Sequence, residues 1–151
     1  IAVRIGADRG GIRLSPSGFA FDMQPYDDNT DTYLYLAREL DARRIAYLHL
    51  SDNGTGDGAP HAIDDALLGQ IRRAYTGGLI LAGKMTGARA QQLIDAGLID
   101  LAGFGQPFIS NPDLVTRLRD GLPLAEPDRD TYYGGDARGY TDYPLADGSP
   151  A

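Results

Sequence analysis

LILAGKMTGARAQQLIDAGLIDLAGFG, residues 79–105, contains two short apolar runs separated by a helical pattern. The runs, residues 79–83 and 98–105, both end in glycine, which is typical of buried strands that lead into tight turns. Between them, Thr86 is a suitable N-cap for a helix whose apolar residues recur at helical spacing and which stops at Gly97. Two buried strands joined by a helix predict neighbouring parallel strands in one sheet.

The same alternation of strand and helix extends toward the N-terminus. Residues 10–16 and 45–50 are two further apolar runs, and each is followed by a polar loop. Between these runs we expect a helix that is capped by Thr30 or Asp31 and ends near Arg44. The first half of the chain therefore predicts two more strands of the same sheet.

Three further segments complete the pattern. A helix is expected to run through Ile63 and Ala74 and to end at Gly77-Gly78. Asn111-Pro112-Asp113 predicts another helix start, with asparagine as the cap and proline at the first helical position. The tail from Gly121 is rich in Asp, Gly, Tyr and Pro, and we expect it to wrap a surface.

Strands of this kind leave two architectures open. They are apolar on both faces, so we expect a parallel sheet that is covered on both sides. This is either an open doubly wound sheet or half of an eight-stranded β/α-barrel. A dinucleotide-binding sheet usually has Gly-x-Gly-x-x-Gly after its first strand, whereas Ser15-Pro16-Ser17-Gly18 follows the first strand here. The sequence therefore favours the barrel.

Composition excludes several classes of function. The 151 residues are 42% hydrophobic and 23% charged, as in one ordinary folded segment. The chain has no cysteine and only two histidines, so we expect no disulfide, no cysteine nucleophile and no metal site. A net charge of −7 argues against nucleic acid or an anionic membrane as a partner. We see no membrane span or signal peptide, and expect a cytoplasmic protein whose chain begins in the middle of a fold.

The turns after the last two predicted strands are candidates for an anion site. In Ala82-Gly83-Lys84 and Gly103-Phe104-Gly105-Gln106, a helix opens shortly after the glycines. Glycine lets main-chain N–H groups approach an anion, helix N-termini add a positive dipole, and β/α-barrels often bind phosphate after strands seven and eight. The structural alternative is that these glycines only make tight turns. Two such turns in succession favour phosphate.

Arg13 lies inside an apolar strand, where an unpaired guanidinium would be costly. We therefore expect it to have a partner, which is either an anionic or electron-rich ligand or an internal carboxylate. His49 is interpreted as a histidine of the core and His61 as a loop residue, and neither is given a catalytic role. The acids at loop-to-helix boundaries are expected to cap helices or face solvent: Asp27, Asp28, Asp64 and Asp65.

Four stretches that span nearly the whole chain carry a family resemblance. They are residues 11–16 (GIRLSP), 47–50 (YLHL), 104–114 (FGQPFISNPDL) and 139–144 (GYTDYP). Together, and in this order, they resemble the Old Yellow Enzyme family of flavin-dependent ene-reductases. That family has a TIM-barrel fold with FMN at the C-terminal ends of its strands. The resemblance implies that residues 1–151 form the C-terminal half of such a barrel, with strands five to eight.

The resemblance also implies roles for individual residues. Arg13 matches the arginine beside the flavin pyrimidine edge, where a cation stabilises negative charge on the reduced ring. Ala82, Gly83 and Lys84 match the backbone site for the FMN phosphate after strand seven. Gly103, Phe104, Gly105 and Gln106 match its counterpart after strand eight. Tyr133 matches an aromatic residue at the border of the substrate pocket, and the alternative for it is packing within the tail.

Two departures from the family pattern matter. The family normally has arginine at position 106, and Gln106 forfeits a charged bidentate contact with the phosphate. We expect Lys84 to compensate as a point charge, and the alternative for it is a solvated surface lysine. The substrate-anchoring pair of the family, His/Asn or His/His, and its proton-donating tyrosine belong to the N-terminal half of the barrel, which these residues do not include.

The activity implied by the resemblance is that of a ping-pong oxidoreductase. NADPH or NADH would reduce FMN, which would pass hydride to an electron-poor alkene, an enone or a nitro compound. This chain alone is expected to be inactive and to pack against the N-terminal half of the barrel or against a second copy of itself. The alternative is a non-catalytic half-barrel module that self-associates and binds flavin weakly at most.

Overall fold

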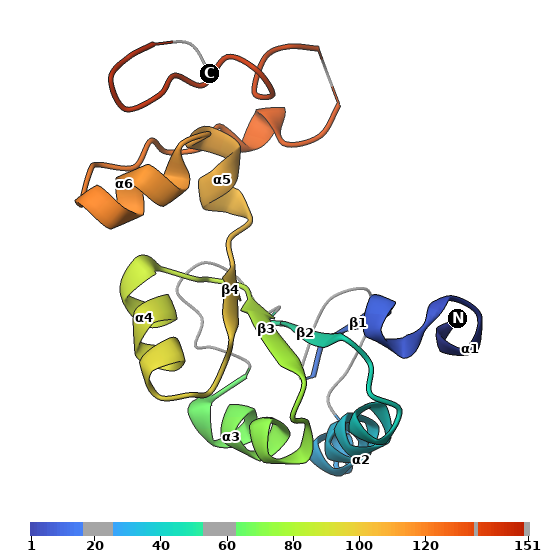
Figure 1. The fold of residues 1–151 in the computed structure, drawn as a ribbon. Coiled ribbons are helices and arrows are strands. Elements are labelled where there is room, and N and C mark those ends of the chain that lie inside the picture. Colours follow the sequence, from blue (N-terminus) through green and yellow to red (C-terminus); the bar gives the residue numbers. More distant parts are fainter. Residues whose placement is uncertain (17–25, 53–62, 135, 150–151) are drawn as a thin grey trace. The chain divides into compact units, whose positions relative to one another are not determined.

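The computed structural model describes residues 1–16, 26–52, 63–134 and 136–149. The chain divides into two compact units, Ile1–Gly103 and Phe104–Ala151. The first unit contains a sheet and the helices that pack on it, and the second contains short helices and a long irregular tail (Figure 1).

A four-stranded parallel sheet forms the centre of the first unit. Its strands are β1 (Gly11–Leu14), β2 (Tyr47–Ser51), β3 (Gly78–Ala82) and β4 (Leu101–Gly103). They follow one another in the order β1-β2-β3-β4, and each pair of neighbours is parallel. A doubly wound sheet reverses its strand order at a switch point, whereas a barrel advances in one direction as this sheet does. The strand order thus supports the predicted half-barrel.

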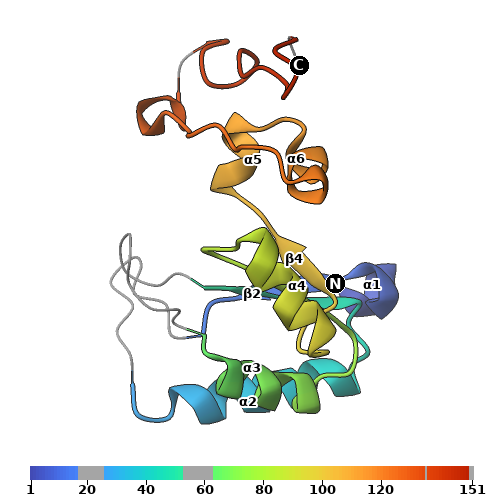
Figure 2. The same ribbon diagram turned by 90° about the vertical axis from the view of Figure 1, so that its left-hand side faces the viewer.

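Three helices connect the strands and cover one face of the sheet. They are α2 (Asn29–Ala42), α3 (Asp65–Ala74) and α4 (Gly87–Asp95), and two of them, α2 and α3, lie side by side below the sheet in Figures 1 and 2. The leucines at alternate strand positions are at most 3% exposed: Leu48, Leu50, Leu79 and Leu81. Each buried leucine contributes about 1.5–3 kcal/mol, so this face holds the unit together.

The opposite face is open in the part of the chain that the structure describes. Arg13, His49, Ile80 and Leu101 are register partners in one row across the four strands. Leu101 at the end of this row is 60% exposed, and Tyr47 on the same face is 43% exposed. Among the described residues only one face of the sheet is covered, so the predicted cover of the second face does not come from them. An uncovered inner face is what half of a barrel presents.

Two helix starts follow the sequence signals. The Thr86 hydroxyl accepts a hydrogen bond from the Arg89 N–H at 3.2 Å, which confirms the predicted cap of α4. Asp64 caps α3, because its Oδ1 atom accepts from the Leu67 N–H at 2.8 Å. Ile63 lies outside α3, directly before its N-cap Asp64. It is buried, so it fits the apolar pattern because it packs in the core and not because it is helical.

The predicted caps of α2 are wrong. This helix begins at Asn29, so Thr30 and Asp31 lie within its first turn. Asp28 occupies the N-cap position without a side-chain cap hydrogen bond. A tight turn takes the place of the cap, since the Asn29 N–H donates to the carbonyl of Tyr26 at 3.0 Å.

The second unit departs further from the expected pattern. It contains α5 (Gln106–Ser110), α6 (Leu114–Asp120) and a 3-10 turn, η2 (Arg129–Thr131), whereas the first unit opens with α1 (Ala2–Ile5) and η1 (Ala7–Arg9). Asn111 is not an N-cap as predicted, because α6 starts after Asp113; it is the C-cap residue of α5. The Asn111 Oδ1 atom instead accepts from the Ala125 N–H at 2.8 Å. Helix α5 was not predicted, since five residues are too few to show a helical period.

Candidate functional site

Parallel strands place the predicted site residues of the first unit at one edge of the sheet. Arg13 lies near the C-terminal end of β1, Ala82 ends β3, and Gly103 ends β4. Gly83 and Lys84 follow directly after β3. In β/α folds, this edge is where ligands bind.

Arg13 is exposed on the open face and is held by one defined contact. Its Nη2 atom donates to the Oγ atom of Ser51, the last residue of β2, at 2.7 Å. Ser51 is only 2% exposed, so the acceptor is fixed by its surroundings. Arg13 is neither buried nor paired with a carboxylate among the described residues, so the structural alternative of an internal ion pair is wrong here. Its charge is oriented and not neutralised.

His49 is the neighbour of Arg13 in the row across the open face. Its Nε2 atom is buried and has no hydrogen-bond partner in the described part of the chain. Burial lowers the pKa of His49, and the positive charge of Arg13 lowers it further. The imidazole is therefore neutral at pH 7, which leaves Arg13 as the cation of this row.

The turn after β3 requires glycine at its first position. Gly83 has a φ of +114°, and a Cβ atom there would lie 2.1 Å from the carbonyl oxygen of Asp52. Lys84 continues the left-handed backbone with a φ of +47°. The chain then enters α4 through its Thr86 cap. This turn has two features of an anion site, namely the dipole of the helix that follows it and a lysine ammonium group.

Gly103 is also required to be small, for a different reason. A Cβ atom on Gly103 would lie 2.9 Å from the Cβ atom of Ala82, its register partner on β3. Two small residues thus let the ends of β3 and β4 come close together. The first unit brings Ala82, Gly83 and Gly103 to one edge, as predicted.

The other predicted phosphate residues and Tyr133 belong to the second unit. Gly105 is the N-cap of α5, and Gln106 is its exposed first residue. Tyr133 is 91% exposed and stands edge-on to Tyr132, with ring centroids 6.4 Å apart at an interplanar angle of 81°. The Tyr133 ring is thus free of the tail packing that was its structural alternative, apart from this one aromatic contact.

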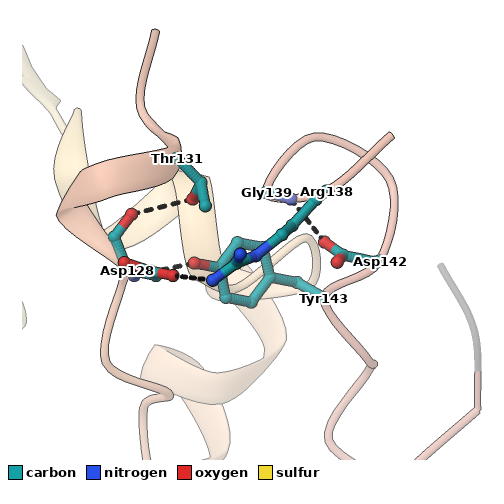
Figure 3. A pocket seen from close by; sticks show the side chains of 6 residues that line it. All are labelled: Asp128, Thr131, Arg138, Gly139, Asp142 and Tyr143. Atoms are coloured by element: carbon teal, nitrogen blue, oxygen red, sulfur yellow. Dashed lines mark hydrogen bonds and ion pairs between the residues drawn. The ribbon is translucent and has the colours of Figure 1, made fainter. Parts of the chain in front are cut away.

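A small polar hollow lies within the tail (Figure 3). Arg138 pairs with Asp128 at 2.8 Å, and the backbone N–H of Asp128 donates to the Tyr143 hydroxyl at 2.8 Å. On the other side, the Gly139 N–H donates to Asp142 at 2.7 Å. The groups that line the hollow are therefore paired with one another, so the hollow is the interior of a folded loop.

The sequence signals missed Arg117 as an important residue. It is 6% exposed and uses its guanidinium for an ion pair with Asp113 and for hydrogen bonds to two backbone carbonyls. The spacing of Asp113 and Arg117, four residues apart, was the available signal. No cluster of His, Asp or Glu side chains suitable for a metal ion, and no helix long and apolar enough to cross a membrane, occurs among the described residues.

Comparison with known proteins places these observations in one family. Residues 1–125 match the model of the NADH:flavin oxidoreductase / NADH oxidase family, and the chain belongs to that family. It is 36% identical over 146 residues to a 12-oxophytodienoate reductase-like protein of Solanum lycopersicum, covering 96% of this chain and 38% of that protein. 12-Oxophytodienoate reductase 2 of Arabidopsis thaliana is also 36% identical over 146 residues, with 95% and 38% covered.

Solved structures agree with the sequence relatives. Morphinone reductase is 41% identical with a TM-score of 0.87, and the match covers 95% of this chain and 38% of that one. The old yellow enzyme of Trypanosoma cruzi is 31% identical with a TM-score of 0.82, covering 95% and 37%. The four strands are thus strands five to eight of a TIM barrel, and the chain spans about 38% of the length of the relatives that it matches.

The cofactor expected for this family is FMN, and the residues of the first unit fit its phosphate and ring system. Arg13 offers a positive charge that no carboxylate neutralises among the described residues. Gly83 forms a tight turn against the Asp52 carbonyl, just before the N-terminus of α4 and next to the exposed Lys84. An anionic, phosphate-bearing group suits this combination of cationic side chains and a helix N-terminus.

Proposed function

We propose that this chain is the flavin-phosphate half of an FMN-dependent ene-reductase. The complete enzyme would take hydride from NADH or NADPH and reduce an electron-poor alkene, an enone or a nitro compound. The observation that carries this proposal is the Arg13 guanidinium, which Ser51 orients at the C-terminal edge of the strands. The names of the relatives also support it, because they are reductases of 12-oxophytodienoate and of morphinone.

Each residue would have a distinct task. When bound, FMN would supply the hydride-transfer chemistry. Arg13 would hold a fixed positive charge against the ring system and so favour negative charge on it. The Gly83 turn would let backbone N–H groups approach the phosphate, with the ammonium group of Lys84 as a nearby point charge. Tyr133 would border the substrate.

The open face of the sheet supports a second part of the proposal, which concerns the partner. Tyr47 and Leu101 expose apolar surface there, and soluble proteins seldom leave such a face and two sheet edges uncovered. We propose that the N-terminal half of the barrel packs on this face. The match covers only 38% of the relatives' length, which leaves enough further sequence in them for such a half. A second copy of this chain is the alternative occupant.

The test uses a completed barrel, in which the N-terminal half of morphinone reductase is joined to this chain or added as a separate polypeptide. We expect FMN to bind with one flavin per barrel and NADH oxidation to depend on added cyclohexenone. Arg13→Ala should lower turnover at saturating FMN by about tenfold or more, the usual effect of losing an electrostatic contact to developing charge. Arg38→Ala, which changes an exposed arginine on α2, is the control.

Equal turnover of the wild type and Arg13→Ala would overturn the role of Arg13. A completed barrel that folds but binds no FMN would overturn the proposed function. The second candidate, a non-catalytic half-barrel module, is favoured by Gln106 in place of the family arginine. It predicts that the chain alone forms a stable dimer by light scattering and that the completed barrel has no reductase activity.

A further inference from the structure

A buried side chain of α6 contacts both ends of the Tyr133 loop at its base, where Asn111 and Ser110 also bind Ala125 at the first end. We use this name for the described residues 126–134 and 136–143. The Arg117 Nη1 atom donates to the carbonyl of Pro123 at 2.8 Å, just before the loop, and its Nη2 atom donates to the carbonyl of Pro144 at 3.0 Å, just after it. One planar guanidinium therefore ties together the two ends of the loop.

Asp113 completes this arrangement from the start of α6. Its Oδ1 atom accepts from the Arg117 Nε atom at 2.6 Å, and its Oδ2 atom accepts from the Ala146 N–H at 2.8 Å. The hydrogen bond from Arg117 is the main cause that holds the pKa of Asp113 below its ordinary value, so the carboxylate is charged at neutral pH. Both oxygens of the carboxylate and all three guanidinium nitrogens are thus used within the second unit.

The loop above this base is itself stiffened by internal contacts. The Asp128 N–H donates to the Tyr143 hydroxyl, which joins the first and last parts of the loop at 2.8 Å (Figure 3). A Cβ atom on Gly139 would lie 2.2 Å from the Thr131 Oγ1 atom, so the two sides of the loop are in close contact. These contacts join the described parts of the loop to one another, so contacts at its base bear on the position of all of them.

We propose that Asp113 and Arg117 form a clasp that sets the position of the Tyr133 loop, and that they are therefore positioning residues for the substrate pocket. The inference rests on the proposed function, because it takes Tyr133 to border the substrate. Arg117 touches neither substrate nor flavin in this scheme. Its effect on the reaction is exerted through the placement of the exposed Tyr133 ring.

Arg117→Lys is the decisive variant, because lysine keeps the positive charge but lacks the planar fork that reaches two carbonyls. Arg119→Lys is the matched control on the same helix, where the arginine is exposed and pairs only with Asp120 among the described residues. In Arg117→Lys we expect the amides of Ala146 and Asp128 to exchange hydrogen about tenfold faster or more, as local opening becomes easier. The amides of β2 and β3 should keep their wild-type rates.

Kinetics of the completed barrel distinguish a misplaced Tyr133 loop from a general loss of folded enzyme. We expect Arg117→Lys to raise the KM for cyclohexenone about tenfold with kcat nearly unchanged, since binding contacts and not the chemical step are altered. FMN affinity should equal that of the wild type. Arg119→Lys should leave exchange, KM and kcat unchanged.

Each other outcome has a defined meaning. Wild-type exchange at Ala146 and Asp128 in Arg117→Lys would overturn the clasp, and a looser loop with an unchanged KM would overturn its role for the substrate. If Arg117→Lys loosens the whole chain, Tyr143→Phe removes only the bond to Asp128 and must give the same split between KM and kcat. Loss of FMN binding by the wild-type barrel would instead refute the proposed function, while the exchange result would still decide the clasp.

Discussion

The Arg13 guanidinium donates to the Ser51 hydroxyl across two neighbouring strands, at 2.7 Å. This contact joins a charged side chain of the open face to a buried residue at the end of β2. A long, flexible side chain is thereby restricted to few orientations before any ligand arrives. Such preorganisation lowers the entropic cost of a later contact.

Ser51→Ala should therefore weaken FMN binding without removing any charge. We expect a loss of about 1 kcal/mol, or roughly fivefold in Kd, the usual contribution of one hydrogen bond. Flavin titration of the completed barrel measures it. Thr116→Ala, which removes a hydroxyl from α6, serves as the control, and an equal Kd for Ser51→Ala and the wild type would show that Arg13 needs no such support.

His49 should make the stability of the chain depend on pH. Its pKa is lower in the folded chain than in the unfolded one, because of burial and of Arg13, so the unfolded state binds more protons in mildly acidic solution. Stability is then fully present above the unfolded pKa of about 6.5 and is lost as the pH falls toward the folded pKa. In His49→Gln this part of the decline should disappear.

Urea unfolding at pH values between about 7 and about 5 tests this prediction. The relevant quantity is the difference between the wild type and His49→Gln at each pH. His61 and the carboxylates are present in both proteins, so their contributions cancel. A difference that does not change with pH would contradict a lowered pKa for His49.

Gly83→Ala and Gly97→Ala form a matched pair for the close approach at the turn. Both glycines have positive φ, +114° and +66°, but a Cβ atom meets the Asp52 carbonyl at position 83 and nothing within 4 Å at position 97. Gly97→Ala should cost about 1 kcal/mol, the conformational term alone. Gly83→Ala should cost more, by about 2 kcal/mol or above, because backbone has to move. Chemical denaturation of both variants checks the difference, and equal losses would contradict it.

Lys84 should be a site where stability and cofactor binding oppose each other. Its φ of +47° is strained for a residue with a Cβ atom, so Lys84→Gly should be more stable than Lys84→Ala by about 1 kcal/mol. Both variants should bind FMN more weakly than the wild type in the completed barrel, since both lose the ammonium group. Thermal unfolding and flavin titration provide the two readouts.

At the control position, the expected difference in stability between the glycine and alanine variants has the opposite sign. At Arg38, inside α2, glycine should be less stable than alanine by about 1 kcal/mol, because glycine is a poor helix former. Unchanged FMN affinity in Lys84→Ala would show that backbone groups alone hold the phosphate.

The open face offers a test of the proposed partner. Leu101→Glu should weaken association of the chain with a separately added N-terminal half by about tenfold or more, because a charge would enter an apolar contact. Val115→Glu is the control, since Val115 on α6 is also exposed, at 66% against 60% for Leu101. Binding measured by calorimetry should distinguish the two variants, and equal losses would argue against this face as the interface.

The parallel sheet could be predicted from the sequence because it depends on patterns that are local. Apolar runs such as residues 79–83, the Thr86 cap and the glycine at position 97 each act within a few residues. Which face the helices of this chain cover was not predicted. Residues that face the inside of a barrel are as apolar as those that face helices. The apolar pattern therefore cannot show which face of the sheet is covered by helices of this chain.

The site residues divide in the same way, into those that a local sequence pattern marks and those that no pattern marks. The Gly83 turn was predicted because glycine after a strand is a local signal, and Arg13 because a charge within an apolar run is conspicuous. Arg117 was missed although Asp113 lies four residues before it, because its other two partners are the backbone carbonyls of Pro123 and Pro144, which no sequence pattern marks. The cap assigned to Asn111 failed for the same reason, since its amide bonds to the backbone of Ala125.

The position of Asp52 has a consequence for how this scaffold can diversify. Its N–H donates to the Ala82 carbonyl at 2.7 Å, and its own carbonyl lies against Gly83, so the chain is anchored to the neighbouring strand before the next segment departs. Insertions, deletions or grafted sequences beyond residue 52 would begin from a fixed point and leave the Gly83 turn in place. The end of β2 and the start of the Gly83 turn thus form one fixed unit, to which following segments of different length could be joined.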